Sequence, residues 1–246
     1  MIDCRDGVPE PVDASPVRSP QTVHSKIAEV VAGKSLVEIG TRNGDGMMCF
    51  ARVAASVSAI EYDKEYCRKL EARARSQSIT LDVQCQDYRR ATLDADFITW
   101  WQQKPLTNRG ALRTLKHHQC IGRVRESAEA ILLFDHSWGN DVQDLERLKS
   151  LFTWTEVVRF DEREECEALR MKIRENTESG VTCQRASGAF TVARLPVSRI
   201  PLSIAGPCQL SKVYVTASST TSFIFSSCLG ALWLLLLARR RRKRGV

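Results

Sequence analysis

The chain has 246 residues, of which 43% are apolar and 26% are charged. These are the proportions of an ordinary globular protein, and they exclude a wholly disordered, collagen-like or polytopic membrane chain. The formal net charge is +7, but the six basic residues at 239–244 supply most of it and leave +1 for the rest. The basic balance therefore belongs to the tail and does not indicate a nucleic-acid-binding domain.

The cysteines indicate the redox compartment in which the chain folds. There are nine of them, an odd number, widely spaced and without a C-x-x-C pair. A disulfide scaffold is typical of a small secreted chain, and a zinc site needs ligands in close pairs. Acidic residues and prolines fill residues 1–20, which fits a flexible leader better than a signal peptide. We therefore expect reduced thiols in a domain that faces the cytosol.

Helical and strand-like patterns alternate from residue 21 onward. Helical spacing of apolar residues is found over 21–32, 44–55, 63–76, 109–120 and 139–152. Short apolar runs typical of strands occupy 35–39, 57–60, 79–85, 95–100, 130–134, 155–160 and 189–194. This alternation predicts an α/β fold with a mostly parallel sheet. The charged segment 161–178 is not a well-patterned crossover, so the last two strands should be antiparallel neighbours.

The turn after the first strand carries the clearest functional signal. The segment 38–46 reads Glu-Ile-Gly-Thr-Arg-Asn-Gly-Asp-Gly. Glycines between a strand and a helix let a ligand approach the backbone closely, at the end of the sheet where α/β proteins bind ligands. A tight turn without a ligand would also explain them.

Two acidic residues follow the next two strands. Glu61 closes the second strand, where a carboxylate can accept hydrogen bonds from both hydroxyls of a ribose. Asp87 follows the third strand, where it can meet an adenine edge. A solvated acid at Glu61 and a helix cap at Asp87 are the simpler alternatives.

Together these residues resemble the class I S-adenosylmethionine-dependent methyltransferases, over about residues 21–195. That family's loop is E/D-x-G-x-G-x-G; Glu38, Gly40 and Gly44 match it, and Arg42 replaces the middle glycine. The resemblance implies a Rossmann-like sheet of seven strands, helices on both faces, an antiparallel last strand and S-adenosylmethionine as cofactor. It also implies that Glu38 and Gly40 line the methionine end, that Glu61 binds the ribose and that Asp87 meets the adenine. Arg42 and Gly44 complete the implied cofactor-binding loop.

Two other function classes stay open. A nicotinamide dinucleotide site has the fingerprint G-x-G-x-x-G, whereas this chain has G-x-x-x-G-x-G with Arg42 where the pyrophosphate would pass. A non-catalytic cofactor-binding or membrane-adaptor protein could use the same fold.

The substrate side offers candidates and no complete motif. Thr-Trp-Trp-Gln-Gln occupies 99–103, where adenine and glutamine methylases of the superfamily carry Asn/Asp-Pro-Pro-Tyr/Phe, which argues against those acceptors. Trp100 and Trp101 are candidate substrate contacts, of which at most one can face the cleft. Asp135 and His136 end the fifth strand, and His136 is the candidate general base.

We expect no metal site, because His117 and His118 lack a further close ligand. The basic stretch 102–125 is either a solvated face or a contact for an acidic substrate.

The C-terminal segment predicts a membrane anchor. The 26 residues between Lys212 and Arg239 carry no charge, and 222–238 form their apolar core. A span needs about 20 mostly apolar residues. We expect a linker over 196–221, a transmembrane helix over 222–238 and a basic tail over 239–246. With the catalytic domain cytosolic, the target would be the mitochondrial outer membrane, the peroxisome or the endoplasmic reticulum. An interfacial helix and a soluble tail with a nuclear-localisation-like cluster are alternatives.

Overall fold

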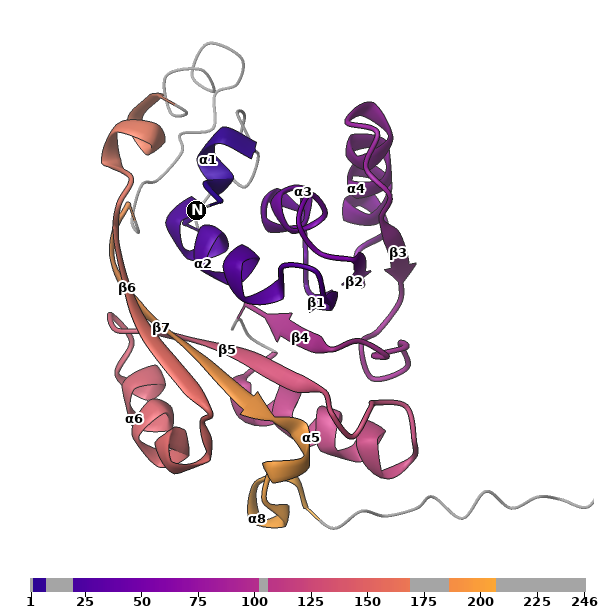
Figure 1. Cartoon of the computed structure of the whole chain (residues 1–246), viewed down its shortest axis with the longest axis vertical. Coiled ribbons are helices and arrows are strands. Elements are labelled where there is room, and N and C mark those ends of the chain that lie inside the picture. The colour runs from indigo at the N-terminus through magenta and orange to yellow at the C-terminus, as the bar shows by residue number, and fades with distance from the viewer. Residues whose placement is uncertain (1, 8–19, 102–105, 169–185, 207–246) are drawn as a thin grey trace, which may run out of the picture. The chain divides into compact units, whose positions relative to one another are not determined.

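The computed structural model describes residues 2–7, 20–101, 106–168 and 186–206. The chain divides into two units, 1–209 and 210–246, and only the first contains described residues. Its centre is a seven-stranded sheet in the order β3-β2-β1-β4-β5-β7-β6 (Figure 1). The strands are β1 (Ser35–Ile39), β2 (Ser56–Glu61), β3 (Asp82–Cys85), β4 (Phe97–Trp100), β5 (Glu129–Asp135), β6 (Trp154–Asp161) and β7 (Ser187–Pro196).

The direction of the strands confirms the predicted α/β fold. Strands β1 to β5 pair in parallel, whereas β7 lies between β5 and β6 and is antiparallel to both. The chain builds outward from β1 through β2 to β3, and then returns to β4 on the other side of β1. The neighbours β1 and β4 therefore form a topological switch point, where open α/β sheets leave a crevice at the carboxyl ends.

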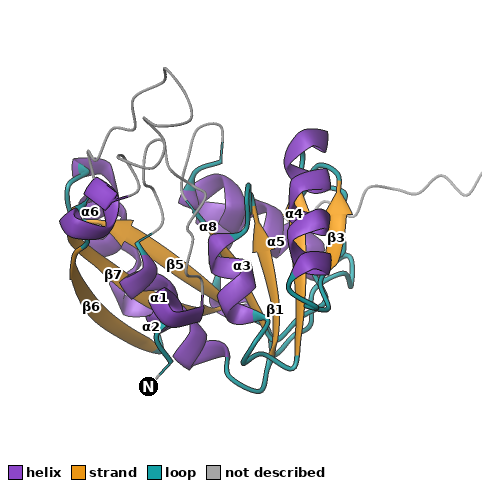
Figure 2. Ribbon diagram, turned by 90° about the horizontal axis from the view of Figure 1, so that it is seen from above, coloured by secondary structure: helices purple, strands orange, loops and turns teal. Residues whose placement is uncertain are grey.

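Helices cover both faces of the sheet (Figure 2). One apolar cluster joins the sheet to α1 (Cys4–Gly7), α2 (Gln21–Val31), α3 (Asp45–Phe50) and α4 (Lys64–Ser76). The other joins it to α5 (Asn108–Cys120), α6 (Gly139–Leu148), α8 (Leu202–Ala205) and the 3-10 turn η2 (Val197–Arg199). A second 3-10 turn, η1 (Lys149–Leu151), follows α6.

Strand β5 shows why the sequence folds this way. Ile131 and Leu133 enter the first cluster, and Leu132 and Phe134 enter the second. A strand that is buried on both faces is a continuous apolar run, which is the pattern that predicted it. Helix α4 begins where Asp63 caps it, because the Asp63 carboxylate accepts hydrogen bonds from the N–H groups of residues 65 and 66.

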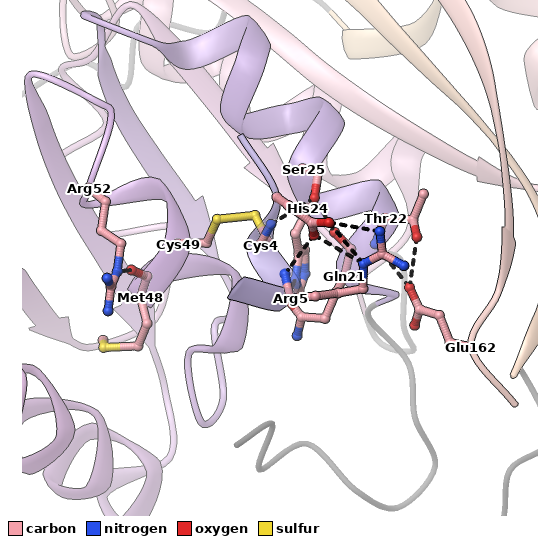
Figure 3. Close-up of a disulfide and its surroundings, with 11 residues drawn as sticks. Cys4, Arg5, Gln21, Thr22, His24, Ser25, Met48, Cys49, Arg52 and Glu162 are labelled. Carbon is pink, nitrogen blue, oxygen red and sulfur yellow. Dashed lines mark hydrogen bonds and ion pairs between the residues drawn. A yellow bond between two sulfur atoms is a disulfide. The ribbon is translucent and has the colours of Figure 1, made fainter. Parts of the chain in front are cut away.

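The expectation of reduced cysteines is wrong. Cys4 is bonded to Cys49 (Figure 3) and Cys67 to Cys85. Cys120 and Cys166 are also disulfide-bonded. The two pairs span 45 and 18 residues and contain no C-x-x-C motif, so spacing alone could not predict them.

Both ends of the domain extend further than predicted. Within the expected leader, residues 4–7 form α1, and Cys4 is fully buried in the core through its disulfide. Within the expected linker, Val197 and Ile200 are buried beneath α5, so the folded unit continues to residue 206. The predicted helix at 44–55 is shorter, ending at Phe50.

Among the described residues, no helix is long and apolar enough to cross a bilayer. The predicted membrane segment, 222–238, lies outside them.

Candidate cofactor site

The glycine-rich turn lies at the switch point of the sheet. The pairing of Ile39 with Ile60 on one side and Trp100 on the other places Gly40 beside Glu61 and Trp101. The ends of β2, β1 and β4 therefore meet at one edge, as the sequence predicted for the loop and for Glu61.

The loop backbone needs glycine at two positions for different reasons. Gly40 has a φ of +75°, and a Cβ added there would meet no atom within 4 Å. Gly44 has a φ of +81°, and a Cβ there would lie 2.1 Å from Cδ1 of Leu70. Gly40 thus keeps open space above the turn, whereas Gly44 lets α4 pack against it.

Arg42, which stands where the family's loop pattern has a glycine, adopts a left-handed backbone conformation. Its φ is +53°, which is uncommon for a residue with a side chain. Two sets of contacts hold it: its N–H donates to Oε2 of Glu61 at 2.8 Å, and its guanidinium donates to the Tyr66 hydroxyl at 3.2 Å. The departure from the family's loop pattern is therefore accommodated by the backbone and by α4.

Glu61 joins the loops that follow β1 and β2. It is buried, and its Oε1 accepts a hydrogen bond from the N–H of Asp63 at 2.9 Å. Together with the bond from Arg42, each carboxylate oxygen accepts one backbone N–H. Because an ionised carboxylate has about four acceptor positions, Glu61 keeps capacity for further donors such as ribose hydroxyls.

An ion pair holds the far end of the loop. Arg73 of α4 donates to Oδ1 of Asp45 at 2.6 Å and to the carbonyl oxygen of Asn43 at 3.0 Å. Asp45 is 3% exposed. The sequence analysis missed both residues; an acid in the first turn of α3 is the signal that could have found Asp45.

Glu38 and Asp87 occupy different environments. Glu38 is buried at the end of β1. Asp87 is half-buried, and its carboxylate accepts hydrogen bonds from the backbone N–H and the guanidinium of Arg89. The hydrogen bonds from Arg89 hold the pKa of Asp87 below its usual value. Asp87 therefore stabilises its own turn, and its contact with adenine stays a prediction.

The two tryptophans have different surroundings. Trp100 is fully buried, and its indole N–H donates to Oδ1 of Asn108 at 3.0 Å. Trp101 is half-buried, with its ring edge-on to His24 and Phe190 at centroid distances of 5.4 and 5.7 Å. Trp100 is thus a core residue, and Trp101 remains the candidate on the substrate side.

Asp135 ends β5 and His136 follows it, and the described hydrogen bonds of their side chains go to other residues. Oδ1 of Asp135 accepts hydrogen bonds from the N–H and the hydroxyl of Ser137. The exposed His136 ring instead places Nε2 2.7 Å from Oγ1 of Thr191. His136 is thus oriented by β7, and its role as a base stays a prediction.

His24 is a buried polar residue that the sequence analysis missed. Its Nδ1 lies 3.3 Å from Oε1 of Gln21 and must donate to that amide oxygen, which leaves Nε2 unprotonated. Within the described part of the chain, Nε2 has no hydrogen-bond partner, and it lies 3.1 Å from where a Cβ on Gly46 would stand. Burial lowers the pKa of His24 to about 4, and the negative charge of Asp45 opposes only part of this shift. A neutral imidazole thus fills the space between α3 and Trp101.

Comparison with known proteins identifies the fold. No family model and no curated protein matches the sequence. Among solved structures, a methyltransferase from Thiobacillus denitrificans that depends on S-adenosylmethionine and holds S-adenosylhomocysteine aligns with a TM-score of 0.50 and 13% identity, covering 72% of this chain and 91% of that one. A Pyrococcus horikoshii protein put forward as an RNA methyltransferase aligns with a TM-score of 0.50 and 12% identity, covering 77% and 89%. A precorrin 8w decarboxylase from Methanobacterium thermoautotrophicum also aligns, with a TM-score of 0.50 and 12% identity, covering 76% and 95%.

These likenesses show a class I methyltransferase fold. They do not show an activity, because the sequence identities are too low to carry one.

Proposed function

We propose that this protein is an S-adenosylmethionine-dependent methyltransferase whose acceptor is still to be found. The observation that carries the proposal is the clamp between Glu61 and the glycine-rich loop at the switch point of the sheet. This clamp lies at the edge where open α/β sheets hold ligands, and Glu61 is our candidate for the ribose there.

The residues at this edge fit the cofactor. Open space at Gly40 admits the methionine part beside the buried Glu38, and Glu61 retains acceptor positions for the ribose. The cofactor would supply a methyl group on a positively charged sulfur. The chain's part is then to orient the acceptor and exclude water, with Trp101 as one wall.

A binding experiment tests the cofactor. S-adenosylhomocysteine should raise the melting temperature of the full-length protein in detergent by mass action, and NAD should not. Calorimetric titration of a Glu61→Gln variant at a temperature where it is folded should show at least tenfold weaker binding. Stabilisation by NAD alone would favour a dinucleotide enzyme, and equal affinities of the variant and the wild type would refute the ribose role.

An activity experiment separates an enzyme from a non-catalytic adaptor. Methyl-labelled cofactor and a cell extract should yield a labelled product with the wild type. His136→Gln should lower turnover more than it lowers affinity for the cofactor, if His136 is the base. Tight cofactor binding without any labelled product would favour the adaptor.

We also propose that 222–238 anchor the protein in a membrane. The support is the uncharged run of 26 residues followed directly by six basic residues. The protein should stay in the pellet after alkaline carbonate extraction, and release by carbonate or high salt would refute a spanning helix. The cytosolic placement of the domain that we expected from the sequence is not proposed again. The disulfides of the domain favour the side of the membrane that faces away from the cytosol.

A further inference from the structure

All six cysteines in the part of the chain that the structure describes are disulfide-bonded. Two complete pairs are Cys4–Cys49 and Cys67–Cys85, with sequence separations of 45 and 18 residues. Cys120 and Cys166 are bonded as well. Because catalytic and redox-sensing pairs are typically close in sequence, as in C-x-x-C motifs, this pattern indicates structural disulfides.

The environment of the sulfurs supports a structural role. Cys4, Cys49 and Cys67 are 0%, 1% and 3% exposed, and the first two lie in the core between α1, α2 and α3 (Figure 3). Cys85, at the end of β3, is exposed. Cys4 also anchors α1 to α2, because its N–H donates to Oγ of Ser25 at 2.9 Å.

Both pairs involve elements that adjoin candidate cofactor residues in the chain. Cys49 lies on α3, the helix that the glycine-rich loop enters, and its bond fixes that helix to the N-terminal segment. Cys67 lies on α4, the helix that begins just after Glu61, and Cys85 ends the strand that precedes Asp87. The helix that follows Glu61 and the strand that precedes Asp87 are therefore covalently joined.

We propose that this domain folds and acts in an oxidising compartment, on the far side of the membrane from its basic C-terminal tail. In the cytosol, glutathione and thioredoxin keep thiols reduced, so a domain with six bonded cysteines is typical of the secretory lumen or the cell exterior. Resting on the proposed methyltransferase function, the acceptor would then be a molecule on that side of the membrane.

The charge of the tail supports this orientation independently. Residues 239–244 are all basic and follow the apolar segment directly. Positively charged flanks stay on the cytoplasmic side of a membrane. A cytosolic domain would force these six charges across the bilayer, whereas the proposed orientation leaves them in the cytosol.

The thiol state in living cells tests the first half of the proposal. Cells that make the protein naturally are treated with a permeant maleimide, and the protein is then denatured, reduced and labelled with polyethylene-glycol maleimide. At least six added groups are expected, and fewer than six would overturn the proposal. A Cys67→Ser/Cys85→Ser variant from the same gene should carry two groups fewer; Cys4→Ser/Cys49→Ser serves the same purpose if the first variant does not fold.

Protease treatment of sealed vesicles with their cytosolic face outward tests the second half. The proposal predicts that an epitope after residue 246 is removed while the domain stays protected. Digestion of the domain with a protected epitope would overturn it. Neither assay involves the cofactor, so their failure is distinguishable from failure of the methyltransferase proposal.

Discussion

Replacing Glu61 with glutamine should weaken the hydrogen bonds that hold the glycine-rich loop and so lower the stability of the ligand-free protein. The carboxylate accepts two backbone N–H groups, from Arg42 and Asp63, at 2.8 and 2.9 Å in a buried position. Glutamine keeps one acceptor oxygen and turns an N–H₂ donor toward the other N–H. One hydrogen bond to a charged group is thus lost, which is about 1.5–3 kcal/mol. For a domain of this size that lowers the melting temperature by about 3–12 °C.

Urea unfolding of the full-length protein without ligand measures this loss of stability. Glu65→Gln is the matched control, because its carboxylate pairs with Lys69 at the surface, where side-chain exposures are 65% and 55%. The control should unfold like the wild type. If Glu61→Gln also unfolds like the wild type, the clamp does not hold the loop, and the structural argument for the site fails.

Three further outcomes follow from named contacts. Gly44→Ala should lower the free energy of unfolding by about 2–4 kcal/mol, because the added Cβ collides with a leucine of α4. Gly40→Ala has a similar φ but open space around the Cβ, and should lower it by only about 1–2 kcal/mol. Urea unfolding measures both. His24 has a folded-state pKa of about 4, so the unfolded chain binds more protons between pH 4 and 6.5 and stability falls as the pH drops through that window. Between pH 7 and 5 the protonation of His24 should lower the free energy of unfolding by about 2 kcal/mol. The pH dependence of His24→Phe should lack this contribution. Removing the Cys67–Cys85 disulfide should cost about 3 kcal/mol, and added reductant should then lower the stability of the variant less than that of the wild type.

The sheet was predictable because its signals are local. The bounds of β1 match the prediction residue for residue, and β5 differs by one residue at each end. Glycines at 40 and 44 mark the turn, and Glu61 ends its strand as predicted. Each of these features depends on neighbours within a few residues, and periodicity and turn chemistry report such neighbours directly.

The missed features depend on contacts distant in sequence. The partner of Cys4 is 45 residues away, and nothing in the sequence separates this pairing from the alternatives. His24 lies on the buried side of α2, where apolar periodicity points to Val23 and Ile27 but gives no reason to bury an imidazole. Which of Trp100 and Trp101 is buried also depends on tertiary packing, because the alternation of a strand says that they face opposite ways and not which one faces the core.

The bond between Cys4 and Cys49 closes the backbone of residues 4–49 into a covalent ring that contains α2, β1 and the whole glycine-rich loop. A protease that cuts this ring once does not release a fragment, because the two pieces stay joined through sulfur. Nicked protein would migrate as one chain until it is reduced. The first strand of the sheet, which pairs with strands on both sides, could then keep its place after its own connection has been severed.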